Sequence, residues 1–351
     1  MPPTLMAESI ARATQGAAAP ILSVRELKTY FHLPEGVVRA VDGVSFDVYP
    51  GRTVGVVGES GCGKSITARS ILGIVDRPGR IESGEILLHG ASAQGGPIDL
   101  VRLAPDGAQL RAIRGKEIAL IFQEPMASFS HYYTVGNQIM EAIRQHSDAS
   151  KEEARARAIE LLRTVGVPQP ERRVDEYPFQ LSGGLRQRVM IAMALACDPR
   201  VLIADEPTTA LDVTTQAQIL DLLRGLQEQR GLALILITHD MGVIAEMADD
   251  VVVMYLGRAV EKGRVDDIFH APKHPYTRAL LRSIPSITAE PRTKLATLGG
   301  SIPHPFNRPA GCPFHPRCPD VMTGVCDSAV PPVLAESDGR EVSCFLYGGT
   351  P

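Results

Sequence analysis

The spacing of hydrophobic positions along the chain predicts alternating strands and helices. Residues 21–46 alternate between apolar and polar side chains in the manner of an antiparallel β-layer, and residues 84–88 predict another short strand. Wholly apolar runs of strand length lie at residues 53–57, 201–204 and 232–237. Such runs are typical of strands buried on both faces in the middle of a sheet. Further strands are predicted at residues 117–122 and 251–256.

A period of 3.6 residues replaces this pattern between residues 134 and 167 and predicts helices. One helix is expected to begin at Ser150, because Ser150 and Glu153 form a capping box. Its apolar face consists of Ala154, Ala158, Leu161, Leu162 and Val165. We therefore predict an α/β core with an antiparallel β-subdomain and an inserted helical subdomain at about residues 124–180. Residues 89–112 are predicted to be a loop-rich insertion.

Charge and composition limit which kinds of protein this chain could be. The 351 residues carry 36 basic and 40 acidic side chains, and the formal charge of −4 gives no support to a nucleic-acid-binding face. No apolar run approaches the roughly 18 residues of a membrane span. The Ala-rich residues 1–20 have neither the basic start nor the continuous apolar core of a signal peptide. We expect a mobile N-terminal tail there and a cytoplasmic protein.

A phosphate-binding loop is predicted at residues 58–65, whose sequence GESGCGKS fits the pattern G-x-x-x-x-G-K-[ST]. It lies between the strand at 53–57 and a helix predicted at 66–74. Glycines let backbone N–H groups wrap around phosphate oxygens, and the helix adds its positive N-terminal end. Lys64 is expected to reach the β- and γ-phosphates, and the Ser65 hydroxyl to bind Mg²⁺. The expected nucleotide-binding residues are Gly58, Ser60, Gly61, Cys62, Gly63, Lys64, Ser65, Ile66 and Thr67.

Polar side chains follow three of the predicted core strands. Asp205 and Glu206 end one strand, His239 follows the next, and Gln123 follows the strand at 117–122. Two buried acids without a cation would be costly, which favours a metal nearby. We expect Asp205 to hold Mg²⁺ through water, together with Ser65 and Gln123. Glu206 is expected to polarise an attacking water, and His239 to contact the γ-phosphate.

Two further signals are ambiguous when each is taken alone. Ser182, Gly183 and Gly184 begin a predicted helix and form a second anion-binding end, although an ordinary helix cap explains them equally well. Tyr30 or Phe31 suits stacking on a nucleotide base, but an aromatic residue half-buried in a strand is the more common case.

Taken in order, these motifs resemble the ATP-binding-cassette ATPases over about residues 21–265. The resemblance implies a head-to-tail dimer that encloses two ATP molecules, each bound by the phosphate loop of one subunit and by Ser182–Gly184 of the other. It also implies that Phe31, or the neighbouring Tyr30, stacks on adenine. Asp212 is implied to communicate across the dimer, and Glu206 to act as the general base.

More narrowly, the chain is similar to the ATPase subunits of dipeptide, oligopeptide and nickel permeases. The matching motifs are QEPM at 123–126, YP at 177–178, LRQR at 185–188, HPYT at 274–277 and GCPFHPRCP at 311–319. The resemblance implies a binding-protein-dependent importer of peptides at the cytoplasmic face of the inner membrane, with oligosaccharides or nickel as alternative cargo. It implies a heterodimer with a second, similar ATPase, two permease subunits and an extracytoplasmic solute-binding protein. A soluble cassette ATPase is the competing class.

Residues 266–351 are expected to form a C-terminal extension with a four-cysteine site. The last 67 residues hold 11 of the 27 prolines and show little periodicity, so they need a staple or a partner to stay folded. The cysteines in these residues lack the C-x2-C pairs of common zinc sites. Ligand chemistry alone leaves three alternatives open: an iron–sulfur cluster, a zinc ion and free thiols. The family resemblance favours a structural [4Fe–4S] cluster over zinc. The cysteines concerned are Cys312, Cys318, Cys326 and Cys344.

Overall fold

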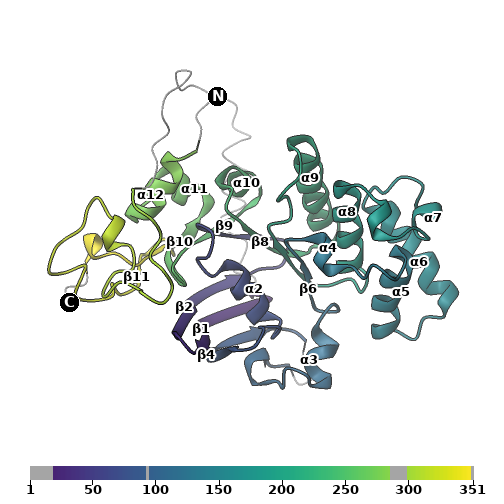
Figure 1. Ribbon diagram of the computed structural model, residues 1–351, viewed down its shortest axis with the longest axis horizontal. Helices are drawn as coiled ribbons and strands as arrows, with labels where there is room; N and C mark the ends of the chain where they lie inside the picture. The colour runs from purple at the N-terminus through teal and green to yellow at the C-terminus, as the bar shows by residue number, and fades with distance from the viewer. Residues whose placement is uncertain (1–18, 92–94, 285–298, 349–351) are drawn as a thin grey trace.

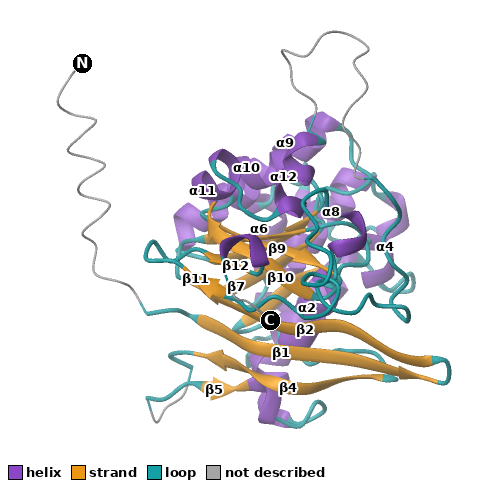
Figure 2. Ribbon diagram, turned by 90° about the vertical axis from the view of Figure 1, so that its left-hand side faces the viewer, coloured by secondary structure: helices purple, strands orange, loops and turns teal. Residues whose placement is uncertain are grey.

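The computed structural model describes residues 19–91, 95–284 and 299–348 (Figure 1). Nearly all of the tail expected at residues 1–20 lies outside the described residues. Two β-sheets lie in layers, and helices cover the far side of the larger sheet (Figure 2). The helices between residues 125 and 194 gather into a subdomain at one end of the molecule (Figure 1). The predicted α/β cassette, with its antiparallel sheet, is confirmed.

The larger sheet has eight strands, in the order β11-β12-β10-β9-β3-β8-β7-β6. Its central strands β9, β3, β8, β7 and β6 run parallel, whereas β10, β12 and β11 are antiparallel. The wholly apolar runs predicted from the sequence form the buried middle of this sheet. The strands are β3 (Thr53–Val57), β6 (Ile118–Ile121), β7 (Val201–Asp205), β8 (Ala233–Thr238), β9 (Asp250–Tyr255), β10 (Arg258–Arg264), β11 (Leu334–Ala335) and β12 (Glu341–Val342).

The smaller sheet is antiparallel and comes mainly from the N-terminal part of the described chain. Its strands follow the order β2-β1-β4-β5, and helix α2 (Lys64–Ile71) contacts both this sheet and β7. One apolar core therefore lies between the two sheets. The segment predicted to be loop-rich contains a short helix, α3 (Ala108–Ile113), whose Leu110 and Ile113 are buried. The strands are β1 (Leu22–Leu33), β2 (Gly36–Val48), β4 (Gly79–Leu88) and β5 (Ile98–Asp99).

Five helices lie between residues 125 and 194 of the described chain, a range that extends beyond the 124–180 expected from the sequence. Ser150 and Glu153 make both hydrogen bonds of the capping box, at 3.2 and 2.8 Å, and the predicted apolar face is buried. The helices are α4 (Pro125–Ser128), α5 (Val135–His146), α6 (Lys151–Thr164), α7 (Pro170–Arg173) and α8 (Gly183–Ala194). Other helices cover the large sheet or follow its strands in the sequence. They are α9 (Val213–Arg230), α10 (Met241–Met247), α11 (Val265–His270) and α12 (Pro275–Arg282).

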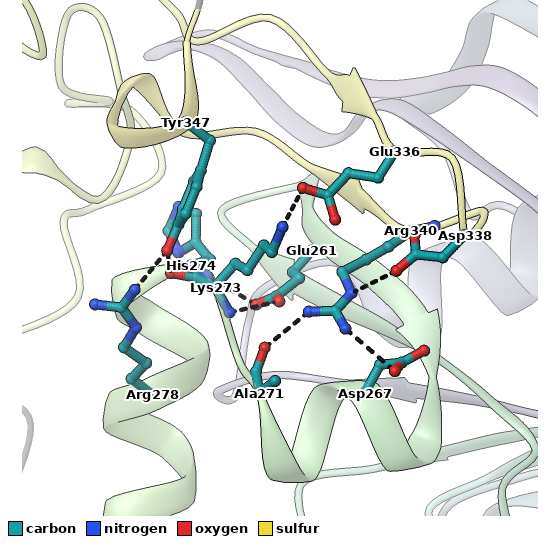
Figure 3. Close-up of polar contacts among 10 residues, drawn as sticks. All are labelled: Glu261, Asp267, Ala271, Lys273, His274, Arg278, Glu336, Asp338, Arg340 and Tyr347. Carbon is teal, nitrogen blue, oxygen red and sulfur yellow. Dashed lines mark hydrogen bonds and ion pairs between the residues drawn. The ribbon is translucent and has the colours of Figure 1, made fainter.

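The C-terminal residues return to the large sheet, where β12 pairs with β10. A network of hydrogen bonds and ion pairs holds this C-terminal segment against the sheet (Figure 3). The buried Glu261 carboxylate accepts the backbone N–H groups of Lys273 and His274 at 2.7 and 2.9 Å. Arg340 donates to the carbonyl of Ala271 at 2.8 Å and pairs with Asp267. The chain after β10 is thus held to the cassette by both strand pairing and charge.

Candidate active site

The phosphate loop connects β3 to α2, as the sequence predicts. Gly58 and Gly63 have φ angles of 153° and 104°, which side chains rarely adopt. A Cβ at Gly58 would lie 2.2 Å from the carbonyl oxygen of Met254, and one at Gly63 would lie 2.1 Å from that of Ala40. Neighbouring backbone therefore permits only glycine at both positions.

Lys64 points back into the loop that precedes it. Its Nζ donates hydrogen bonds to the carbonyls of Gly58 and Glu59 at 2.8 and 3.2 Å, and the residue is buried. Cys62 is also buried, and burial raises the pKa of its thiol although Lys64 nearby lowers it. Cys62 is therefore a neutral filler of the loop, and Lys64 is the positive charge that the loop encloses.

Ser65 and Asp205 meet at the end of β7. The Ser65 hydroxyl donates to the Asp205 carboxylate at 3.0 Å. Burial raises the pKa of Asp205, and the neighbouring Glu206 carboxylate raises it further. A divalent cation would reverse both effects, and a hydroxyl with a carboxylate is the oxygen donor set that Mg²⁺ prefers. The residues present therefore fit the expected magnesium ion.

Glu206 lies at the centre of a second group of polar side chains. It receives hydrogen bonds from Gln123 Nε2 at 3.1 Å and from the Thr209 hydroxyl at 2.9 Å, and His239 Nδ1 lies 3.3 Å away. The backbone of Glu206 has a φ of 47°, an uncommon conformation for a side chain of this size. Such strained residues cluster at functional sites because the surrounding structure has to hold them in place.

Part of each group opens onto one cleft, whereas Asp205 and His239 are not among its lining residues. The residues that line it include the phosphate loop, Gln123 and Glu206, which the sequence predicts together. The structure also places there residues that sequence reasoning missed. The missed lining residues are Val38, Arg39, Ala40, Leu256, Gly257, Pro305 and Arg308.

Neither aromatic candidate is among the residues that line this cleft. Tyr30 donates its hydroxyl to Asp42 at 2.7 Å, and the Arg39 guanidinium lies 5.7 Å from the centre of its ring. Burial and the bond to Asp42 raise the pKa of Tyr30 to about 12, so the phenol remains a donor. The Phe31 ring packs over Gly79 of β4, where an added Cβ would lie 2.6 Å from it.

The Ser-Gly-Gly motif and Asp212 lie outside the cleft of their own chain. Ser182 caps α8, with a distance of 3.4 Å from the Leu185 nitrogen to its hydroxyl, and Asp212 caps α9 through Thr215 at 3.0 Å. These hydrogen bonds from Thr215 lower the pKa of Asp212. A Cβ at Gly184 would lie 2.8 Å from a side-chain carbon of Thr215. The two caps are therefore packed against each other.

The C-terminal cysteines lie close enough to influence one another's pKa. Burial raises the pKa of both Cys312 and Cys318 to about 11, and neighbouring cysteines add to each shift. Within residues 19–91, 95–284 and 299–348, no three or more His, Cys, Asp or Glu side chains are arranged to hold a metal ion. The expectation of a [4Fe–4S] cluster or zinc is therefore not supported.

Two family models match the chain. A model described as ABC transporter matches residues 41–209, and one described as the C-terminal region of oligopeptide/dipeptide transporters matches residues 260–326. The dipeptide transport ATP-binding protein DppD of Escherichia coli (strain K12) is 48% identical over 324 residues, which cover 92% of this chain and 96% of that protein. The oligopeptide transport ATP-binding protein AppD of Bacillus subtilis (strain 168) is 49% identical, covering 93% and 97%.

Solved structures agree with these matches. A dimeric bacterial ABC transporter cassette is 28% identical, with a TM-score of 0.60, and covers 70% of this chain and 98% of its own. The same cassette in a post-hydrolysis state, bound to ADP and phosphate, gives a TM-score of 0.61 at 27% identity. None of the helices in the described part of the chain is long and apolar enough to cross a membrane.

The fold and the cleft thus define the class, an ATPase of the ABC type. The chain belongs to the family of dipeptide and oligopeptide transport ATP-binding proteins.

Proposed function

We propose that this chain hydrolyses ATP in the cleft described above and thereby drives the uptake of dipeptides or oligopeptides through a membrane permease. The observation that carries the proposal is the position of Glu206. Its carboxylate is held by Gln123, Thr209 and His239 beside the Ser65–Asp205 pair. A base beside a phosphate loop is what attack by water on the γ-phosphate requires.

Each of these side chains has a role in the proposed reaction. Lys64 holds the β- and γ-phosphates, and Glu206 takes a proton from the attacking water. His239 contacts the γ-phosphate, while Gln123 orients the water through its bond to Glu206. Ser65, Asp205 and Gln123 would hold Mg²⁺, which supplies charge neutralisation for the phosphates when it is bound.

The proposed active form is a dimer in which each cleft is closed by the other subunit. Ser182, Gly183, Gly184 and Asp212 lie outside their own cleft, and the first three form the N-terminal end of α8, a kind of helix end that suits an anion. The structurally similar cassette is itself dimeric. We propose a heterodimer with a second, similar ATPase, as the family resemblance implies, in which the signature and loop of each subunit complete the partner's site.

An exposed aromatic surface on the helical subdomain is suited to contact a permease subunit. Tyr132 and Tyr133 are 88% and 59% exposed, and Phe179 is 55% exposed. A backbone bond of 2.9 Å from Val135 to Glu176 brings the two segments together. Large exposed aromatic groups mark interaction sites. We propose that one of two permease subunits docks here, at the cytoplasmic face of the inner membrane, and that the two together receive cargo from a solute-binding protein.

Peptide cargo is proposed from the relatives, whose names specify dipeptide or oligopeptide transport. The test is uptake by vesicles that contain the complete transporter, with labelled dipeptide, oligosaccharide or Ni²⁺ offered in turn. We expect ATP-dependent uptake of the peptide, and loss of uptake with Glu206→Gln. ATP-dependent uptake of the sugar or of Ni²⁺ instead of peptide would replace this cargo assignment while leaving the ATPase role intact.

A further inference from the structure

The outer end of the nucleotide cleft is formed partly by the C-terminal chain. Pro305 and Arg308 line the same cleft as Lys64 and Glu206, although they follow the phosphate loop by more than two hundred residues. The segments around Arg39 and Gly257 line the same cleft. The phosphate loop fixes the phosphates at the inner end, so the base of a bound nucleotide has to extend toward this outer wall.

The Arg308 guanidinium is held in place by a single buried carboxylate. Its Nη1 donates to Asp42 at 2.8 Å, and Asp42 also receives the Tyr30 hydroxyl at 2.7 Å and pairs with Arg258 at 2.9 Å. Asp42 is 3% exposed. A planar group fixed in this way loses little freedom when a ligand binds.

A second donor on the same guanidinium is unused. Arg308 Nη2 is buried and has no hydrogen-bond partner among the described residues. Nη2 is enclosed by protein atoms, so the rest of the Arg308 side chain is what lines the cleft, and this donor is not offered to a ligand. Arg39, the other arginine of this wall, lies over the Tyr30 ring. Arg308 is the arginine that the C-terminal chain supplies to the cleft.

The loop that carries Arg308 is fastened to the cassette. Arg317 forms a bidentate pair with Glu59 in the phosphate loop, at 2.7 and 3.0 Å, and its Nε donates to the carbonyl of Gly299 at 3.1 Å. Phe306 packs beside Gly36 of β2. These contacts hold residues 299–317 against the cassette, and the network in Figure 3 holds the chain before and after them.

We propose that Arg308, supported by Pro305, forms the base-side wall of the nucleotide site, so that the C-terminal chain contributes directly to recognition of the adenine nucleotide. The guanidinium plane stacks on the purine. This inference rests on the proposed function, because it assumes that the phosphates of ATP occupy the loop around Lys64.

The test compares equilibrium binding of Mg-ATP and of Mg-tripolyphosphate, which has no base or ribose, to the full chain. We expect Arg308→Ala to weaken ATP binding about tenfold and to leave tripolyphosphate unchanged. Arg258→Ala is the matched control, because it removes a cation from the same Asp42 without lining the cleft. We expect it to leave both affinities within about twofold.

Three outcomes would overturn the inference. They are unchanged ATP affinity in Arg308→Ala, equal weakening of both ligands, and equal weakening by the Arg258 control. If Arg308→Ala does not fold, Arg308→Lys is used, because it keeps a charge beside Asp42 without the planar group. A selective loss of ATP affinity of about threefold is then expected. Wild-type ATP affinity in this variant would overturn the proposal. Lys64→Ala should weaken both ligands. If it weakens neither, the proposed function fails instead.

Discussion

The two ends of the nucleotide cleft are built in different ways. At the phosphate end, β3, β7 and β8 bring their final residues to one edge of the sheet, and the backbone itself dictates which residues fit. At the base end, the wall is assembled from β2, the turn between β9 and β10, and a loop around Arg308. Side-chain chemistry rather than backbone geometry decides what binds there.

This difference explains why the phosphate end of the cleft has a recognisable sequence motif and the base end has none. Gly58 and Gly63 tolerate no side chain, because backbone carbonyls lie 2.1–2.2 Å from where a Cβ would be. No such backbone restriction applies at Pro305 and Arg308, and many residue types can form the outer wall of the cleft. The predictions below separate the two ends, beginning with the largest expected effect.

The largest effect is expected at Glu206. Replacing Glu206 with Gln removes the proposed base and should reduce ATP hydrolysis by about 10²–10⁴-fold, while ATP still binds. Phosphate release and nucleotide binding measure the two properties separately. Glu152→Gln, at an exposed position in α6, is the control and should turn over normally. Near-normal hydrolysis by Glu206→Gln would remove that residue from the mechanism.

Gly63→Ala tests whether backbone geometry fixes the phosphate end. Gly63 has a left-handed backbone, and a Cβ there would lie 2.1 Å from the carbonyl oxygen of Ala40. The substitution should therefore cost about 2–5 kcal/mol of folding free energy and abolish ATP binding. Gly61→Ala is the matched control, since Gly61 has a φ of 78° but nothing within 4 Å of an added Cβ. Its cost should be about 1–2 kcal/mol. Urea denaturation compares the two, and equal costs would show that the close approach does not matter.

His274 tests how the C-terminal chain is fastened. Burial lowers the pKa of His274 to about 3 from its usual 6.5. Between pH 6.5 and 3 the unfolded chain therefore binds a proton that the folded chain does not, so stability should fall as pH falls. The loss at pH 5 is about 2 kcal/mol. His274→Asn keeps a side-chain acceptor for the Tyr276 N–H but does not titrate. An unchanged difference in unfolding free energy between pH 8 and pH 5 in this variant would refute the assignment.

Arg317→Ala should sharpen the contrast between the two ends of the cleft. Because its partner Glu59 belongs to the phosphate loop, we expect ATP and tripolyphosphate to weaken together, by about fivefold, a change on the order of 1 kcal/mol. Arg308→Ala should affect ATP alone. Arg278→Ala, in the network of Figure 3, is the control and should change neither affinity. Selective loss of ATP with Arg317→Ala would show that Arg317 acts at the base end.

Much of the fold follows from the sequence because period and length identify its strands. The runs at 53–57, 201–204 and 232–237 are buried strands in the structure, and Ser150 caps its helix as expected. Helix α3 was not predicted, since its six residues are too few for a helical period to emerge from the surrounding loops.

The phosphate end of the site also follows from the sequence, because strand ends in a parallel sheet converge by geometry. The base end does not, since it depends on where a loop some 240 residues away along the chain returns. The cysteine spacing likewise did not reveal the arrangement of the thiols. That arrangement depends on how residues 299–348 fold back onto β10, which leaves no local pattern.

ATP hydrolysis by the complete transporter in lipid is the most direct test of the central claim that this chain couples ATP hydrolysis to peptide uptake. Its rate should be measured with empty and with peptide-loaded binding protein. We expect the loaded binding protein to stimulate hydrolysis, and Glu206→Gln in this chain to abolish the stimulation. A brisk rate that responds neither to the membrane subunits nor to the loaded binding protein would contradict the claim.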